Sequence, residues 1–334
     1  MNTKRIISLV ASLALVLSLS VGLTGCGDKA AQDDNQGSTD GEGTKYTVGI
    51  CQLVQHEALD AATQGFIDAL NEALPGQVEI VNKNASGDSA NCSTIVNGFV
   101  SDGVDLIMAN ATPALTAAAA ATSDIPILGT SITAYSVALD IDDFNGTVGG
   151  NISGTSDLAD LEAQANMITE WFPDATKVGL LFCSAEPNSR YQIEEVAKYL
   201  SDKGIETQEF AFTDTNDVAS VTQSAADYSD VVYVPTDNTA ASNTEAIANV
   251  LVPAGVPAIC GEEGICKGCG VATLSIDYYE LGRTTGEMAV KILKGEADIS
   301  TMAIEYYPNP VKKYNPEMAT AYNVTIPSDY EAIG

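Results

Sequence analysis

Between residues 46 and 132, short apolar runs alternate with longer amphipathic runs. Strands are expected at 46–54, 78–85, 104–111 and 125–132, with helices at 56–74, 89–102 and 113–122. Parallel strands need long crossover connections, which are usually helices. The alternation therefore favours an α/β fold built on a doubly wound parallel sheet.

The same alternation returns about halfway along the chain. A second set of strands is expected at 177–185, 205–212, 230–238 and 256–262, with helices at 188–203, 215–228 and 240–253. Gly49 and Gly179 are 130 residues apart, and Pro126 and Pro257 are 131 apart. A repeat of this size predicts two similar lobes, each with its own sheet.

A further strand, helix and strand are expected at 271–277, 278–295 and 302–308. This extra unit follows the second lobe and can cross back to the first, which gives several crossings and a hinge. The predicted division is a first lobe at 46–155 plus 278–298, and a second lobe at 156–277 plus 299–334.

The N-terminus has the pattern of a secretion signal, with Lys4 and Arg5 ahead of an apolar stretch that ends near Leu23. A retained transmembrane helix is the alternative, since the stretch is nearly long enough to span a membrane. Residues 23–26, LTGC, resemble a bacterial lipobox. The resemblance implies cleavage before Cys26 and a lipid anchor on its sulfur.

The polar run that follows Cys26 lacks apolar periodicity, as expected for a flexible tether. The sequence therefore predicts a signal peptide at 1–25 and a lipid-anchored linker at 26–45. The protein is expected outside the cytoplasm, attached to the bacterial cell membrane.

The charge balance excludes some classes of protein. The chain has 15 Lys and Arg against 45 Asp and Glu, a formal net charge of −30. Nucleic-acid binding needs clustered basic residues, so no nucleic-acid partner is expected. The excess of acidic residues is expected to give a well-solvated surface that resists association. The alternative is that the negative charge steers a cationic ligand toward the protein.

The chain has few of the residues that most enzymes need. His56 is the sole histidine, which excludes a Ser-His-Asp hydrolase unless His56 is the base, and also excludes His-rich zinc sites. There is no phosphate-binding GxxxxGK[ST] motif, so any ATP hydrolysis has to come from a partner. Neither an enzyme nor a cofactor is expected, although an enzyme on the same scaffold is an alternative.

Six cysteines follow Cys26. Cys51, Cys183 and Cys260 lie in apolar strand runs and are expected to be buried free thiols. Cys266 and Cys269 form a CxxC pair, which suits a disulfide in an oxidising habitat. A zinc site with Cys260 and a redox motif are weaker alternatives.

Ligands of open parallel sheets bind at the carboxyl ends of the strands, near helix N-termini. Two facing lobes would bring together the segments at those ends, which are 52–57, 111–113, 130–131, 186–189, 236–238 and 261–262. The hydroxyls of Thr112, Ser131 and Ser189 suit a carboxylate, and Asp237 suits an ammonium. The predicted ligand is a small zwitterion.

Several of these residues also have a purely structural interpretation. Asp237 can cap the following helix or form an Asx-turn. Asn188 and Ser189 can cap a helix as well, and His56 with Glu57 can provide a cap and a favourable charge at a helix start.

The sequence is similar to the substrate-binding lipoproteins of ABC transporters for tryptophan/tyrosine uptake. The segments that carry the likeness are 52–70, 101–114, 187–189, 233–239 and 275–295. The resemblance implies a type I periplasmic-binding-protein fold with three crossovers that closes on an amino acid and delivers it to a membrane permease. With the strand-end segments, it gives these ligand-binding candidates: Gln52, His56, Glu57, Thr112, Pro113, Ser131, Tyr135, Asn188, Ser189, Thr236, Asp237, Asn238 and Asp277.

The sequence departs from the expected pattern at Ala134-Tyr135, where the resemblance implies an Asp-Pro pair. Tyr135 can stack on an aromatic ligand or pack at the hinge.

The expected function is a monomeric binding lipoprotein of an ABC importer, with a separate ATPase subunit, that captures Trp, Tyr or Phe. The alternative is a ligand-sensing lipoprotein for another amino acid, a sugar or a nucleoside.

Overall fold

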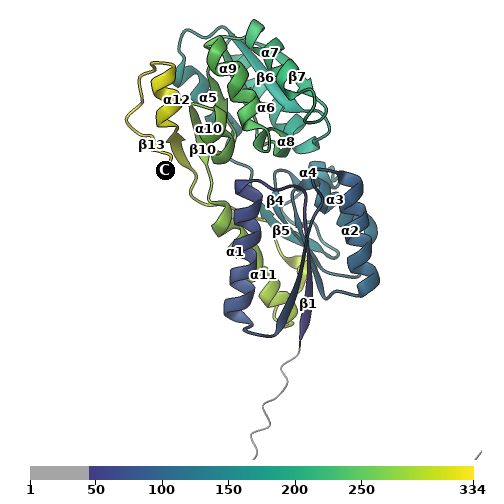
Figure 1. Cartoon of the computed structure of the whole chain (residues 1–334). Helices are drawn as coiled ribbons and strands as arrows, with labels where there is room; N and C mark the ends of the chain where they lie inside the picture. The colour runs from purple at the N-terminus through teal and green to yellow at the C-terminus, as the bar shows by residue number, and fades with distance from the viewer. Residues whose placement is uncertain (1–44) are drawn as a thin grey trace, which may run out of the picture. The chain divides into compact units, whose positions relative to one another are not determined.

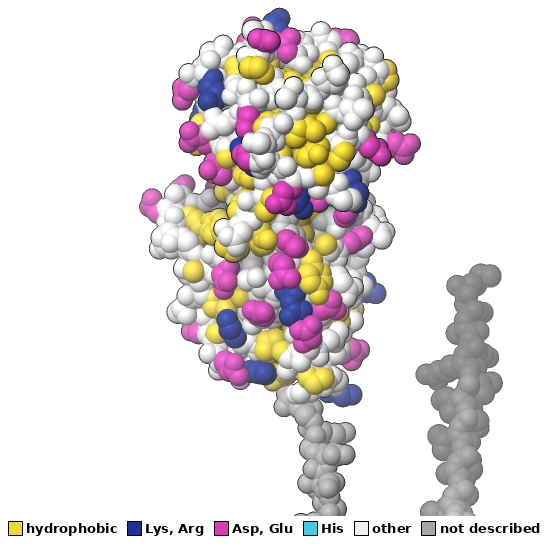
Figure 2. All heavy atoms as spheres, turned by 90° about the vertical axis from the view of Figure 1, so that its left-hand side faces the viewer, with side chains coloured by type: hydrophobic (Ala, Val, Ile, Leu, Met, Phe, Trp, Pro, Cys, Tyr) yellow, Lys and Arg dark blue, Asp and Glu magenta, His cyan; other side chains and the backbone are white. Residues whose placement is uncertain are grey.

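The computed structural model describes residues 45–334. The predicted signal peptide, Cys26 and all but the last residue of the linker lie outside this part. Among the described helices, none has the length and apolar character needed to span a bilayer. Acidic side chains are scattered over the face seen in Figure 2, with lysines and arginines between them, as expected for a solvated surface.

The first lobe contains a sheet of six strands whose paired neighbours all run parallel. In spatial order the strands are β11 (Glu305–Tyr306), β5 (Ile152–Ser156), β4 (Ile127–Ile132), β3 (Leu106–Asn110), β1 (Tyr46–Gln52) and β2 (Val78–Asn84). The strand β3 is buried along its whole length, because helices cover both faces of the sheet.

One face of the first sheet packs on α1 (Glu57–Ala73) and α11 (Tyr278–Leu293), through side chains such as Phe66 and Met288. The other packs on α2 (Ser89–Asp102) and α3 (Thr112–Ala121), with Leu115 in that core. Figure 1 shows these two pairs of helices on opposite sides of the strands. A short helix, α4 (Tyr135–Ala138), follows β4.

The second lobe contains a sheet of seven strands. Their spatial order is β13 (Glu331–Ala332), β12 (Val311–Tyr314), β10 (Ala272–Ser275), β9 (Ala258–Cys260), β8 (Val231–Val234), β6 (Lys177–Cys183) and β7 (Glu206–Phe212). The pairing of β12 with β10 is antiparallel, and the other pairs are parallel.

Helices also cover both faces of the second sheet. One core includes residues of α5 (Leu161–Trp171) and α6 (Pro187–Asp202). The other includes residues of α7 (Val218–Tyr228), α9 (Thr244–Ala254) and α10 (Glu263–Cys269). Two short helices, α8 (Asn238–Ala241) and α12 (Pro316–Ala321), complete the second lobe. The 3-10 turn η1 (Ile299–Thr301) packs against the core of the first lobe through Ile299.

The chain passes between the lobes three times: after β5, between β10 and α11, and between β11 and β12. This arrangement confirms the predicted α/β fold with two sheet-based lobes and a hinge of several crossings. One boundary differs from the prediction. The strand β11 pairs with β5 of the first sheet, although 299–334 was assigned to the second lobe. The pairing joins distant segments, so local sequence could not indicate it.

The CxxC pair lies in α10, a helix that the sequence analysis did not predict. Cys266 and Cys269 are fully buried and, like the other described cysteines, are free thiols. The disulfide alternative is therefore wrong for this structure. Cys51, Cys183 and Cys260 are buried, as predicted. Within residues 45–334, no group of three or more potential ligands is arranged to hold a metal.

Candidate functional site

A narrow cavity lies where the two lobes meet. Its lining comes from both lobes and consists of His56, Ala58, Leu59, Ser131, Thr133, Asp157, Asn188, Thr236, Asp237, Asn238, Ala241, Glu262 and Tyr278. The free space is about 10 Å³, enough for roughly one water molecule. A larger ligand can enter only if the lobes move apart or the lining side chains shift.

Strand ends and helix starts place most of the lining. Ser131, near the end of β4, has a left-handed backbone with φ of 56°. Asn188 lies in the first turn of α6, Thr236 to Asn238 connect β8 to α8, and Glu262 precedes α10. Five of the six predicted strand-end segments therefore contribute to one cavity.

Three polar atoms of the lining are buried and have no hydrogen-bond partner among residues 45–334: Ser131 Oγ, Asp157 Oδ1 and Asn188 Oδ1. The residues are only 6%, 5% and 4% exposed. An unpaired buried polar atom is costly, so such atoms usually have a partner in the protein or in a bound molecule. Their gathering around one cavity is typical of a binding site.

Asp237 is held by main-chain hydrogen bonds from two elements. Its Oδ1 accepts from the N–H of Ala240 at 2.8 Å, and its Oδ2 accepts from the N–H of Cys183 at 2.7 Å. Burial, with the nearby Glu186 charge, raises the pKa of Asp237 to about 7. The helix-capping interpretation of Asp237 describes this geometry, and both carboxylate oxygens already have partners.

Glu186 and Glu262 are two further buried carboxylates beside the cavity. Glu186 accepts hydrogen bonds from the N–H and Nδ2 of Asn238 and from the N–H and Oγ1 of Thr239. Glu262 caps α10 by accepting from the N–H groups of Gly264 and Ile265. Burial raises the pKa of Glu262 to about 7.

Two contacts connect the lobes beside the cavity. His56, the residue before α1, lies with its Nε2 3.2 Å from Oδ1 of Asn238 in α8. Burial lowers the pKa of His56. Glu57 Oε1 lies 3.3 Å from Lys267 Nζ, and both side chains are largely exposed.

Some predicted site residues are engaged inside a lobe and do not line the cavity. Gln52 accepts from Thr63 Oγ1 and donates to Asp60 Oδ1, which ties β1 to α1. Thr112 begins α3 and Ser189 lies in the first turn of α6, and both are buried.

Tyr135 packs inside the first lobe. It is 2% exposed, and its hydroxyl lies 3.1 Å from the carbonyl oxygens of both Gly129 and Thr155. Its side chain therefore does not face the cavity. Of the two predicted roles, stacking on a ligand does not agree with this packing. A Cβ at Gly129 or Gly154 would lie within about 2.5 Å of this hydroxyl, so the two glycines make room for it.

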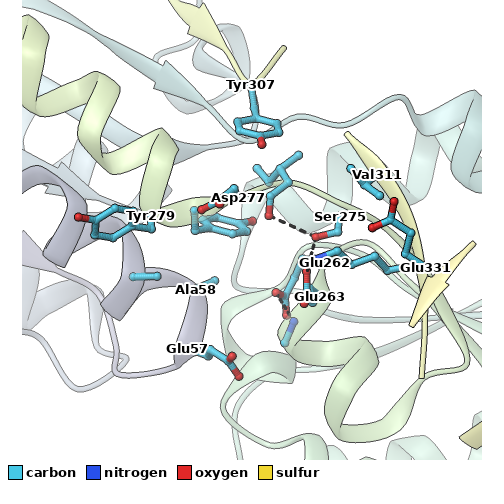
Figure 3. Close-up of a pocket in the computed structure, with 15 residues that line it drawn as sticks. Glu57, Ala58, Glu262, Glu263, Ser275, Asp277, Tyr279, Tyr307, Val311 and Glu331 are labelled. Atoms are coloured by element: carbon cyan, nitrogen blue, oxygen red, sulfur yellow. Dashed lines mark hydrogen bonds and ion pairs between the residues drawn. The ribbon is translucent and has the colours of Figure 1, made fainter. Parts of the chain in front are cut away.

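A wider hollow of about 420 Å³ adjoins the cavity. It shares Ala58, Glu262 and Tyr278 with the cavity, and two predicted site residues, Glu57 and Asp277, line it instead. Figure 3 shows Glu57, Ala58, Glu262 and Asp277 with Tyr279, Tyr307 and Glu331 around the hollow. The remaining predicted site residue, Pro113, lines a different hollow.

The sequence analysis did not identify Asp157, Thr133, Leu59 or Tyr278 as site residues. Asp157 directly follows β5, a strand that was not predicted. Tyr278 begins a predicted helix, and the candidate chosen at that helix start was its neighbour Asp277. The rule that strand ends carry ligand-binding residues would have indicated Asp157 if β5 had been predicted.

Two α/β lobes with a polar cavity between them form an architecture that is typical of solute-binding proteins. The chain belongs to the family described as ABC transporter substrate binding protein, which it matches over residues 47–329. This membership confirms the family resemblance seen in the sequence.

Similar proteins agree on the architecture. A "Tyrosine-binding protein" of Clostridioides difficile is 34% identical over 303 residues, 89% of this chain and 86% of that protein. A solved structure described as an ABC domain in complex with L-Trp, from Streptococcus pneumoniae, is 31% identical with a TM-score of 0.81, covering 85% of this chain and 97% of its own. A ligand-free, open substrate binding protein from Clostridium difficile is 33% identical with a TM-score of 0.66, covering 86% and 99%.

Proposed function

We propose that this substrate-binding protein captures an aromatic amino acid, L-Trp or L-Tyr, between the lobes at the narrow cavity, whose lining has to move outward to admit it. The main support is the set of unpartnered buried polar atoms at Ser131, Asp157 and Asn188. It provides two acceptor oxygens, which suit an ammonium, and one hydroxyl, which can donate to a carboxylate. The described binding of tyrosine and L-Trp by relatives at 34% and 31% identity supports the aromatic choice.

We propose hinge closure as the binding mechanism. The two relatives of solved structure have similar identity to this chain, but the TM-score is 0.81 for the L-Trp complex and 0.66 for the open, ligand-free protein. This difference supports a lobe arrangement close to that of the complex. A ligand that contacts both lobes binds the closed state better, so it shifts the population toward closure.

Import requires partners that the chain itself does not provide. We infer that a membrane permease with a separate ATPase subunit accepts the ligand, and that the protein binds without turnover as a monomer. We also propose that it works outside the cytoplasm with a lipid on Cys26. Metabolic labelling with a fatty acid should label the wild-type protein and not Cys26→Ser, whereas a wild-type protein without label would contradict the anchor.

A thermal-shift screen of the purified protein tests the ligand class. The screen should include the standard amino acids, a set of sugars and a set of nucleosides, because a ligand that binds only the folded state raises the melting temperature. We expect L-Trp or L-Tyr to give the largest shift. A sugar or nucleoside that gives the largest shift instead would overturn the amino-acid assignment and leave the fold unaffected.

A further inference from the structure

Asp157 lies on the hinge itself. It follows β5 of the first sheet and precedes α5, which packs in the core of the second lobe. The residue is 5% exposed, and its main-chain N–H donates to the carbonyl of Ile132 at the end of β4. Its side chain is therefore held on the first of the three crossings, where the lobes meet.

A second crossing orients the Asp157 carboxylate. The hydroxyl of Tyr278, the first residue of α11, donates to Asp157 Oδ2 at 3.0 Å. Tyr278 is 7% exposed and comes directly after the chain returns from the second lobe. One hydrogen bond thus joins two of the crossings, and within the described residues Oδ1 accepts no hydrogen bond of good geometry. Burial raises the pKa of Asp157 to about 6, and the hydroxyls of Tyr278 and Thr133 act against that rise.

The other carboxylates of the cavity lining have their oxygens occupied. Asp237 accepts main-chain hydrogen bonds on both oxygens, and so does Glu262. A buried carboxylate oxygen without a donor is best satisfied by a cationic donor from a bound molecule. Among these three residues, Asp157 alone has such an oxygen at the cavity.

We propose that Asp157 binds the ammonium group of the captured amino acid, so that the ligand's positive charge is held by the hinge and not by either lobe. This inference rests on the proposed function. The titratable groups that face Asp157 around the cavity are Tyr278, His56, Asp237 and Glu262, with Tyr135 behind it in the first lobe. The geometry also makes Tyr278 a positioning residue, because its hydroxyl fixes the carboxylate without filling Oδ1.

Isothermal titration of wild type and Asp157→Asn tests the proposal. The ligands are L-Trp, L-Tyr and their analogues without the amino group, indole-3-propionate and 3-(4-hydroxyphenyl)propionate. We expect Asp157→Asn to weaken binding of the amino acid by roughly 30-fold or more, the effect of removing one partner of a buried charge pair. Binding of the matching analogue should stay the same or improve.

Asp160→Asn is the matched control, since Asp160 caps α5 three residues further on, is exposed and does not line the cavity. It should bind the amino acid as wild type does. Tyr278→Phe keeps the carboxylate and should weaken amino-acid binding by about fivefold, the size of one ordinary hydrogen bond. Its affinity for the matching analogue without the amino group should stay unchanged, so this variant carries the test if Asp157→Asn does not fold.

The outcomes separate the two proposals. If wild type binds neither L-Trp nor L-Tyr, the proposed function fails before any variant is measured. If wild type binds one of them but Asp157→Asn weakens the amino acid and its analogue equally, or weakens neither, the role of Asp157 is wrong while the function stands. In a folded Tyr278→Phe protein, unchanged amino-acid affinity or an equal loss for the analogue would overturn the positioning role, and the role of Asp157 with it if Asp157→Asn does not fold.

Discussion

His56 Nε2 lies 3.2 Å from Asn238 Oδ1, and this hydrogen bond joins the start of α1 in the first lobe to α8 in the second. Because an amide oxygen can only accept, Nε2 carries the proton. The bond can exist only while the lobes are close together. It should therefore stabilise the closed state relative to the open one.

Replacing His56 by alanine should shift the equilibrium toward open lobes. A lost hydrogen bond of ordinary strength is about 1 kcal/mol, or roughly a fivefold loss in the affinity for L-Trp or L-Tyr. Titration calorimetry measures the affinity, and small-angle X-ray scattering should show a larger radius of gyration without ligand. Wild-type affinity together with a wild-type radius would show that the contact does not hold the lobes.

The second contact between the lobes should matter far less. Glu57 and Lys267 lie 3.3 Å apart, but their side chains are 66% and 48% exposed. Exposed ion pairs typically contribute about 0–1 kcal/mol and are screened by salt. With salt screening we expect the pair to retain about 0.4 kcal/mol or less, so Lys267→Ala should change ligand affinity by about twofold or less. A loss as large as that of His56→Ala would indicate a closure driven by surface charge.

Buried carboxyl groups should make the folded protein less stable as the pH rises. Burial raises the pKa of Glu262 to about 7, well above the value of an exposed glutamate. The folded protein therefore binds this proton more tightly than the unfolded chain does. The resulting stability is complete below the unfolded pKa and is lost as the pH rises through about 7.

Urea unfolding between about pH 6.5 and pH 8.5 tests this sign. His56, whose pKa is lowered, acts in the opposite direction near the lower end of the range, and its effect is shared by wild type and variant. Wild type should lose stability over the range, and Glu262→Gln should lose less, by roughly 0.5–1 kcal/mol. Asp237, with a pKa of about 7, should leave part of the dependence in the variant. Glu245→Gln, at an exposed glutamate of α9, is the control and should behave as wild type. Equal slopes for Glu262→Gln and wild type would contradict the assignment.

The alternation of apolar and amphipathic runs predicted most strands of both sheets, because buried parallel strands are continuous apolar runs. It failed where glycine interrupts the pattern. The strand β5 contains Gly154, whose φ is 142°, and follows the pair Gly149-Gly150, so its sequence lacks a strong strand signal. The site residue Asp157 was missed together with that strand.

Side-chain direction was the other limit of the sequence. Tyr135 follows a strand end, which places it where ligands usually bind. Its ring turns into the first lobe because Gly129 and Gly154, on two paired strands, leave space for the hydroxyl. That space depends on three separate segments, and their proximity is a property of the fold that local sequence does not reveal.

The crossing of α1 and α11 gives a final prediction, because it sets the position of the hinge residue Tyr278. A Cβ on Gly65 of α1 would lie 2.0 Å from the carbonyl oxygen of Tyr279, and one on Gly282 of α11 would lie 2.0 Å from that of Ala62. Backbone atoms cannot move aside as a flexible side chain can. Gly65→Ala should therefore push the helices apart and cost about 2 kcal/mol or more.

Gly98→Ala in α2 is the matched control, since a Cβ there meets nothing within 4 Å. Alanine is favoured over glycine inside a helix, so this variant should be more stable than wild type by about 0.5–1 kcal/mol. Urea unfolding measures both variants. If Gly65→Ala gained stability as Gly98→Ala does, the close approach of α1 and α11 would be wrong. The position that this contact gives to Tyr278 beside Asp157 would then lose its support.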